Sequence, residues 1–456
     1  MMAISSGYFT RYRHIAPLAM LRACFGAVLF VSTIRFIAKG WVYDFYIAPK
    51  FHFPFLGFEW LHPAAPAFMY VIYGTMALAA LGICLGLFYR ICSITFFICF
   101  AYAALLDKTY YLNHYYLVTI FSLLLLLTPA HRYFSLDVLR KPSLKITKVP
   151  AWTIFVFKCQ LGIIYVCAGL SKLTSDWCIK AMPLKIWLPA KADVPLIGPL
   201  LKYEATAYLF SWAGALFDLS IVFLLSNKPT RKAGYLLVIS FHLLTAMLFQ
   251  IGMFPYLMMS ATLIFFSEDF HKRSIHFFQG LFKQNAITND EDLCLPVKKL
   301  HQQWVPVVLA LYFIIQLALP FRFLLYPGNL LWTEEGYRFS WRVMLMEKGG
   351  TSFFYVKNPQ TRKKFEVNNR SFLTAYQERM METQPDMMLQ YAHLLKQQYQ
   401  LKGIANPEVT VESYVTLNGS GSRLYIDSTV NLANQQETLF GHKKWILPYQ
   451  GKSPQQ

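Results

Sequence analysis

YYLVTIFSLLLLLTPA (115–130) and AWTIFVFKCQLGIIYVCAGL (151–170) are two apolar runs that follow one another in the chain. A helix that crosses a bilayer needs about 20 mostly apolar residues. The loop between the runs, 131–150, is rich in lysine and arginine, as loops on the cytoplasmic side of a membrane usually are. This stretch therefore predicts a membrane hairpin with its loop on the cytoplasmic side.

The composition of the whole chain agrees with a membrane protein. Of 456 residues, 55% are hydrophobic and only 15% are charged, whereas soluble domains carry roughly 25% charged residues. This hydrophobicity also excludes a disordered chain. The formal charge of +19 indicates basic cytoplasmic loops and contact with anionic lipid, rather than nucleic acid.

Further apolar runs outside the hairpin extend the membrane region. The first begins after Arg11 and Arg13 and has no clear cleavage site, so we interpret it as a retained span rather than a signal peptide. The stretch 233–267 is interrupted near Gly252 and forms either one kinked helix or two short helices. The predicted spans besides the hairpin are 17–38, 66–88, 91–106, 205–226 and 303–319.

Loop charge favours about nine spans. If the N-terminus is cytoplasmic, the basic loops 131–150 and 227–232 are cytoplasmic too, and 268–302 joins them only if 233–267 crosses twice. An eight-span chain would leave the charges of 268–302 outside. The nine-span topology places the loops 39–65, 107–114 and 171–204 outside, together with the C-terminal region, so we expect function on the outer face.

The C-terminal region has the composition of an extramembrane domain. Residues 409–417 alternate with period two, as a half-buried strand does, and 422–431 resumes a strand-like pattern. Met388, Tyr391, Leu395 and Tyr399 form a helical stripe. We therefore expect a multi-span α-helical membrane domain over 1–319 and an extracytoplasmic, β-rich α+β domain over 320–456.

Lys172 is the most informative ionisable residue, because it ends the apolar run of the fifth span. Charged groups near membrane depth are costly and often functional. A lysine here can snorkel to the interface. If it is buried instead, desolvation disfavours the ammonium and leaves an amine that can accept a proton.

Asn113 and His114 are the second candidates, at the outer start of the fourth span. They could orient an anion or donate to a developing oxyanion, although a histidine among tyrosines is often structural. We expect the neighbouring Asp107 and Lys108 to form a solvated charge pair.

Three further polar residues lie within spans. His242 needs a hydrogen-bond partner if it is buried, and Asp218 is expected to have a packing or ion-pair role. Arg22 is expected to snorkel. The sequence contains no HExxH, GxSxG, P-loop or strand–helix GxGxxG motif, and we expect no metal site.

Several stretches in fixed order carry a family resemblance. The sequence resembles the vitamin K-dependent γ-glutamyl carboxylase family in a compact, bacterial-looking form, and AGLSKLTSDW (168–177) with IGMF (251–254) is the strongest pair. The other matching stretches are PLAMLR (17–22), FHFPFLGFEWLHP (51–63), LGLFYR (85–90), LLDKTYYLNH (105–114), FDLS (217–220), FH (241–242), LFQIGMFPY (248–256), QLALP (316–320), WTEEGYRFSW (332–341) and QYAHLL (390–395).

The resemblance implies a definite reaction. Family enzymes deprotonate reduced vitamin K, a menaquinol-like hydroquinone in bacteria, and the anion reacts with O2. The strongly basic alkoxide that results removes a γ-proton from glutamate in a protein or peptide, and the carbanion adds CO2. The expected partners are thus a quinol, a glutamate-containing protein or peptide and the lipid bilayer, with no metal and no nucleic acid.

The resemblance also implies roles for residues of this chain. Lys172 would be the initiating base, with His114 and Asn113 lining the reaction site. Tyr165, His242 and Met253 are expected to contact the quinol, and Trp332, Tyr337 and Trp341 the glutamate substrate. The family commonly has two adjacent lysines, and the first of them is Ser171 here.

Two other functions stay open from the sequence. One is a quinol epoxidase that lacks the carboxylation half of the reaction. The other is a non-catalytic membrane binding, transport or sensor module, since fold does not fix function. Transport would place facing charges in several spans, whereas the polar candidates here cluster at the outer ends.

Overall fold

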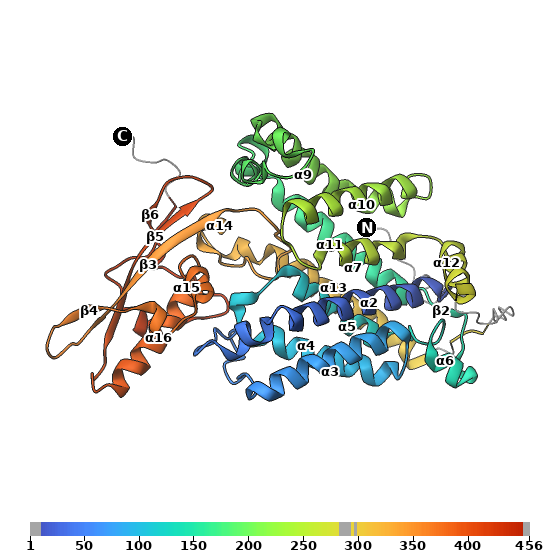
Figure 1. The fold of residues 1–456 in the computed structure, drawn as a ribbon, viewed down its shortest axis with the longest axis horizontal. Helices are drawn as coiled ribbons and strands as arrows, with labels where there is room; N and C mark the ends of the chain where they lie inside the picture. The colour runs from blue at the N-terminus through green and yellow to red at the C-terminus, as the bar shows by residue number, and fades with distance from the viewer. Residues whose placement is uncertain (1–10, 282–292, 296–298, 450–456) are drawn as a thin grey trace.

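The computed structural model describes residues 11–281, 293–295 and 299–449. A bundle of long helices makes up most of the molecule, and a smaller domain with a sheet extends from one end of it (Figure 1). Both parts of the predicted architecture, a helical bundle and an α+β domain, are therefore present.

In the part of the chain that the structure describes, six helices are long and apolar enough to cross a membrane. They coincide with six of the predicted spans, because each is a nearly uninterrupted run of residues that favour burial in lipid. The six are α2 (Ala16–Ala38), α3 (Pro66–Leu85), α4 (Tyr89–Leu106), α7 (Trp152–Lys172), α9 (Glu204–Ser226) and the segment Trp304–Leu325, which contains most of α13 (Lys299–Phe321).

The remaining predicted spans form shorter helices. The stretch 115–130 lies in α5 (Asn113–Leu127), and 233–267 divides into α10 (Arg231–Leu248) and α11 (Phe254–Ala261). The division occurs where Phe249 is extended and Gly252 has a φ of +63°, a conformation that glycine adopts without strain. Two helices with a turn, rather than one kinked helix, thus fill 233–267, while the count of nine spans stays a prediction.

Connecting helices complete the helical part. They are short or lie at the ends of the bundle, and α12 is followed by residues outside the described part of the chain. These elements are α6 (Leu136–Arg140), α8 (Leu184–Trp187), α12 (Glu268–Leu281) and α14 (Leu330–Thr333).

The loops that were predicted to be cytoplasmic from their positive charge lie together at one end of the bundle. Strand β1 (Tyr12–His14) pairs antiparallel with β2 (Lys148–Pro150), and the amide of Thr147 donates to the carbonyl of Leu293 over 2.9 Å. The N-terminal segment, the loop 131–150 and part of 268–302 therefore lie together, as the nine-span topology requires.

The C-terminal domain is built on a four-stranded antiparallel sheet. Its strand order is β4-β3-β5-β6, and β3 pairs with β5 along its whole length. Every second residue of β5 is buried, as a half-buried strand requires, because α16 (Pro385–Leu401) packs on β5 and α15 (Ala375–Met381) packs on β3. The strands are β3 (Lys348–Lys357), β4 (Lys364–Glu366), β5 (Glu408–Leu417) and β6 (Arg423–Leu424).

The predicted strand 422–431 is shorter than expected. Only Arg423 and Leu424 form β6, and Ile426 makes an isolated bridge to Ile446 instead. The chain turns away because the C-terminal segment around Trp445 covers this edge, where Asp427 donates its amide to the carbonyl of Trp445.

Arg22 does not snorkel, contrary to expectation. It is fully buried, and its guanidinium donates to the carbonyl of Phe134. Gly86, which ends α3 in the left-handed conformation, makes this possible, because a Cβ there would lie 1.8 Å from the Arg22 Nη1 atom.

Asp107 and Lys108 do not form a solvated pair either, since both are 3% exposed. Asp107 accepts hydrogen bonds from the Thr109 amide and from Gln377, and Lys108 Nζ lies 2.7 Å from Asp386. The C-terminal domain packs on this loop and supplies both partners, so neither charge reaches water.

Candidate functional site

Lys172 occupies the last turn of α7, where the negative end of the helix dipole favours a cation. Its side chain is buried, with 6% of the residue exposed. Nζ donates to Asp218 Oδ2 over 2.7 Å and lies 3.4 Å from the carbonyl oxygen of Ala168. The ring of Trp177 lies 5.4 Å from Nζ. The lysine is therefore not a snorkelling side chain.

Asp218 comes to Lys172 because α7 and α9 pack closely. Gly169 makes this approach possible: a Cβ at this position would lie 2.7 Å from the Leu219 side chain and 2.9 Å from its backbone nitrogen. Small residues permit such close contact between membrane helices. The glycine of the AGLSK segment thus sets the separation of the two charged groups.

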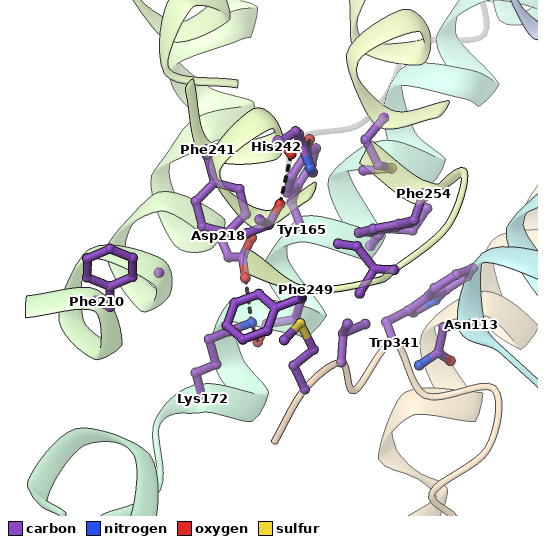
Figure 2. Close-up of a pocket in the computed structure, with 18 of the residues that line it drawn as sticks. Asn113, Tyr165, Lys172, Phe210, Asp218, Phe241, His242, Phe249, Phe254 and Trp341 are labelled. Carbon is purple, nitrogen blue, oxygen red and sulfur yellow. Dashed lines mark hydrogen bonds and ion pairs between the residues drawn. The ribbon is translucent and has the colours of Figure 1, made fainter. Parts of the chain in front are cut away.

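The Lys172–Asp218 pair borders a cavity between α7, α9, α10 and the segment after α14 (Figure 2). Its volume is about 100 Å³, and an apolar cavity of about 150 Å³ can hold benzene, so the space is on the order of one aromatic ring. Most of the wall is aromatic or aliphatic. Its residues include Trp177, Phe210, Phe241, Phe249, Phe254, Met258, Val343 and Met344.

Tyr165 and His242 form a second polar pair on this cavity. The Tyr165 hydroxyl lies 3.0 Å from His242 Nε2, and both residues are buried. No group in the described part of the chain forms a hydrogen bond with the Nδ1 atom of His242. Because buried polar groups are nearly always satisfied, this atom is suited to a polar group on a bound molecule.

Trp341 and Asn113 join the cavity wall from the outer end. The Trp341 ring stacks on Tyr116 with centroids 4.9 Å apart, and its buried Nε1 has no partner. Asn113 donates to the carbonyl of Arg342 over 2.6 Å and accepts from the Tyr111 hydroxyl. Asn113 therefore ties the segment that carries Trp341 to the start of α5.

Five of the nine site residues expected from the sequence line this one cavity: Lys172, Asn113, Tyr165, His242 and Trp341. His114 lies beside this cavity and is buried against the ring of Phe254. Its Nε2 atom is 4.0 Å from the point that a Cβ atom on Gly252 would occupy, so the turn before α11 passes close to the imidazole.

The other three expected residues lie apart from this cavity. Met253 lines a separate, smaller cavity between α2, α3 and α4. Trp332 is in the core of the C-terminal domain, where its indole donates to Leu447. Tyr337 is half-buried in the connecting segment.

Asp218 was expected to have only a packing or ion-pair role, so the sequence interpretation missed it as part of the site. The signal was present, since a carboxylate in an apolar run needs a partner and Lys172 was the nearest unexplained cation. The aromatic wall from Phe210 to Phe254 had no such signal, because these rings resemble lipid-facing residues. Among the described residues, no group of three or more His, Cys, Asp or Glu side chains could hold a metal ion.

The geometry defines a multi-span membrane protein with a buried, charged cavity at the junction with an α+β domain. The family model described as HTTM domain matches residues 10–270, more than half of the chain. The model described as vitamin K-dependent gamma-carboxylase, lumenal domain, matches residues 301–452. The chain belongs to the vitamin K-dependent γ-carboxylase family, as the resemblance predicted. No solved structure matches it.

Proposed function

We propose that this protein deprotonates a quinol in the Lys172 cavity and uses the oxygen-dependent reaction that follows to carboxylate glutamate side chains of a protein or peptide. The observation that carries the proposal is the buried Lys172–Asp218 pair on a largely apolar cavity. Membership of the carboxylase family supports the same chemistry.

The residues around the cavity fit reduced vitamin K. Its aromatic head matches the Phe and Trp walls, and its oxygens match the unpartnered His242 Nδ1 and Trp341 Nε1 atoms. The apolar isoprenoid tail suits the lipid beside α9 and α10. When bound, reduced vitamin K supplies an acidic hydroxyl and, after reaction with O2, the strong base that the carboxylation by CO2 needs.

Lys172 and Asp218 would act together as the proton acceptor. A proton moved across the 2.7 Å contact converts the ammonium and carboxylate into a neutral amine and a neutral acid. Low-polarity surroundings favour such neutral forms over separated charges. The amine can then take the hydroxyl proton, and the ammonium that results stabilises the negative charge left on the oxygen.

The remaining residues would position the reactants. Asn113 and His114, at the outer start of α5, would hold the reacting groups, and Tyr165 with His242 would orient the quinol ring. Met253, at the start of α11, lines a separate cavity, so the contact with the quinol that the resemblance implies for it is not part of this arrangement. Trp341, with Tyr337 on the connecting segment, would meet the glutamate substrate, and Trp332, buried in the core of the C-terminal domain, would hold the start of that segment in place. This arrangement requires an extracytoplasmic C-terminal domain and a cytoplasmic N-terminus.

Ser171 favours a second candidate, a quinol epoxidase that does not carboxylate. The family commonly has a lysine at this position, but the Ser171 hydroxyl donates to the carbonyl of Ala168 over 2.7 Å and is turned back on its own helix. Ser171 therefore does not supply the second positive charge that a lysine at this position would bring to the cavity. The step that adds CO2 would take place without that charge.

The test uses the full chain in lipid nanodiscs with reduced vitamin K, O2, labelled CO2 and a glutamate-containing peptide. The wild type should form epoxide and fix label. Lys172→Ala should lower epoxide formation by about 100-fold or more, the usual contribution of a general base. Lys180→Ala is the matched control, because Lys180 is an exposed lysine paired with Asp176.

Undiminished epoxide in Lys172→Ala would remove Lys172 from the mechanism. Epoxide without fixed label in the wild type would identify the epoxidase instead. No epoxide from the wild type would leave a non-catalytic membrane module as the function.

A further inference from the structure

Large apolar side chains are exposed on two loops where the bundle meets the C-terminal domain. One loop precedes α3, and Trp60 on it is 70% exposed. The other belongs to the C-terminal domain, where Leu439 is 62% exposed and Phe440 is 67% exposed. Exposed apolar residues that gather in one place mark a surface that contacts a membrane or a partner. We call Leu56, Phe58, Trp60, Leu439 and Phe440 the apolar rim.

The apolar rim adjoins the ends of two membrane helices. Tyr326, the residue after the span Trp304–Leu325, donates its hydroxyl to the carbonyl of Leu439 over 2.8 Å. Leu56 and Leu439 border one cavity together with Leu105, which lies in the last turn of α4. Both loops therefore lie where these helices leave the membrane.

The surface of the last membrane helix continues into the rim. Leu324 and Leu325 end this span, and both are exposed, as residues that face lipid are. Because the Tyr326 hydrogen bond places Leu439 close to them, an apolar surface extends from the bundle onto the C-terminal domain. The bilayer that covers Leu324 and Leu325 is therefore within reach of Leu439 and Phe440.

The loop before α3 has the features of a backbone that enters the interfacial layer of a membrane, where lipid headgroups meet acyl chains. Backbone polar groups that leave water need partners. The amide of Gly57 donates to Glu59 Oε1, and the amide of Phe58 donates to the carbonyl of Phe55, each over 2.9 Å. Tryptophan, here Trp60, is enriched in this layer, while the charge of the exposed Glu59 keeps the loop from entering deeper.

We propose that the apolar rim inserts into the interfacial layer of the leaflet that faces the C-terminal domain. Its partners are the glycerol region and the upper acyl chains of phospholipids, which accept apolar and aromatic side chains. The two loops add to the chain connection through Tyr326 and limit rotation of the domain about it. Insertion does not depend on any reaction at Lys172.

The test measures contact with lipid in the full chain, reconstituted in phosphatidylcholine nanodiscs without quinol. Bromine atoms on the upper part of the acyl chains quench tryptophan emission at short range. In brominated nanodiscs, the emission that Phe440→Trp adds to the wild-type signal should be mostly lost. Leu401→Trp is the matched control, because Leu401 is also exposed and ends α16, which begins beside Lys108 and extends away from the bundle (Figure 1). Its added emission should be unchanged.

A second pair of variants uses tryptophans already in the chain. Trp60→Phe should remove emission that brominated lipid quenches, so the quenched fraction of the total emission should fall. Trp445→Phe is its control, because Trp445 is buried in the core of the C-terminal domain. Its removal should not lower that fraction.

No quenching of the emission added by Phe440→Trp would overturn the proposal, since water or a partner protein would then cover the rim. Equal quenching in Phe440→Trp and Leu401→Trp would overturn it too, because the lipid contact would not be specific to the rim. If Phe440→Trp does not fold, Trp60→Phe still decides, because a quenched fraction that stays unchanged would contradict insertion.

Discussion

Two buried aspartates in this molecule hold lysines in different ways. Among the described residues, Asp218 has Lys172 as its only ionic partner, and the pair borders a cavity. Asp386 binds both Lys108 and Arg338, each over 2.6–2.7 Å, at the contact between the membrane loop and α16. Burial alone would raise the pKa of Asp386, but the attraction of these two cations outweighs it and lowers the pKa below its usual range.

The difference separates the pair that we propose to be reactive from a structural one. At Asp386 a carboxylate with two cations stays charged, and a proton cannot easily be added or moved. At Asp218 a single cation and a single anion can exchange one proton, and the free side of the cavity admits a third group. The number of partners and the space beside them therefore say more about function than burial alone.

The largest expected effect is the loss of the structural cluster. Asp386→Ala removes the carboxylate closest to Lys108 and Arg338 and leaves Lys108 with Glu437, 3.8 Å away, so it should cost about 3 kcal/mol in the free energy of unfolding. The measurement is denaturant unfolding of the C-terminal domain, followed by tryptophan fluorescence. Asp193→Ala, at an exposed site, is the control and should change stability by less than about 0.5 kcal/mol. A similar small change in Asp386→Ala would mean that the cluster does not hold the domains together.

A substitution in the Lys172–Asp218 pair should lower the rate of epoxide formation. Asp218→Asn removes the group that can take the amine proton, so epoxide formation should fall by about 100-fold. The fall should be in turnover rather than in the quinol concentration that gives half-maximal rate. Asp269→Asn, at an exposed site on α12, should have no effect. Full activity in Asp218→Asn would show that Lys172 works without its partner.

Asp107 is a third buried carboxylate and differs from both Asp218 and Asp386. Among the described residues it is held by hydrogen bonds, and no cation forms an ion pair with it. Burial raises the pKa of Asp107 to about 6, against hydrogen bonds from Thr109 and Gln377. The folded state thus binds a proton that the unfolded state has released, and stability present below pH 4 is lost as the pH rises through 6.

We expect this loss of unfolding free energy to be about 3 kcal/mol and to be absent in Asp107→Asn. Unfolding measured from pH 4 to pH 7 checks it. Stability that rises over this range in the wild type, with the rise removed in Asp107→Asn, would show the opposite sign and an ionised Asp107.

The smallest expected change in stability concerns both members of the reactive pair. The double variant Lys172→Met and Asp218→Leu replaces two charges by apolar groups of similar size. Such replacements are often neutral or stabilising, so its unfolding free energy should equal that of the wild type or exceed it by about 1 kcal/mol, with no epoxide formed. A strongly destabilised double variant would give the pair a structural role like that of Asp386.

Local patterns predicted the helices and much of the site. The apolar run 151–170 predicted α7 to within two residues of its end, but left open whether Lys172 snorkels or is buried, and the stripe from Met388 to Tyr399 lies in α16. Strand β3 was not predicted, because its first residues, Lys348-Gly349-Gly350, do not favour a strand.

The partners of buried charges were the least predictable feature. Gln377 is 270 residues from Asp107, and Asp386 is similarly far from Lys108. Nothing near Asp107 or Lys108 in the sequence indicates these contacts. Lys172 and Asp218 are only 46 residues apart, on helices that follow closely in the chain, and so were within reach of a pairing argument.

The wall of the Lys172 cavity formed by Trp341, Val343 and Met344 comes from residues beyond the last long apolar helix. During synthesis α7 and α9 leave the ribosome well before this segment. In a nascent chain that has not yet reached residue 341, the Lys172 cavity therefore lacks the part of its wall that Trp341 forms. In the proposed mechanism, the quinol reaction would therefore begin only after residues 341–344 have been made and have packed on α7 and α9.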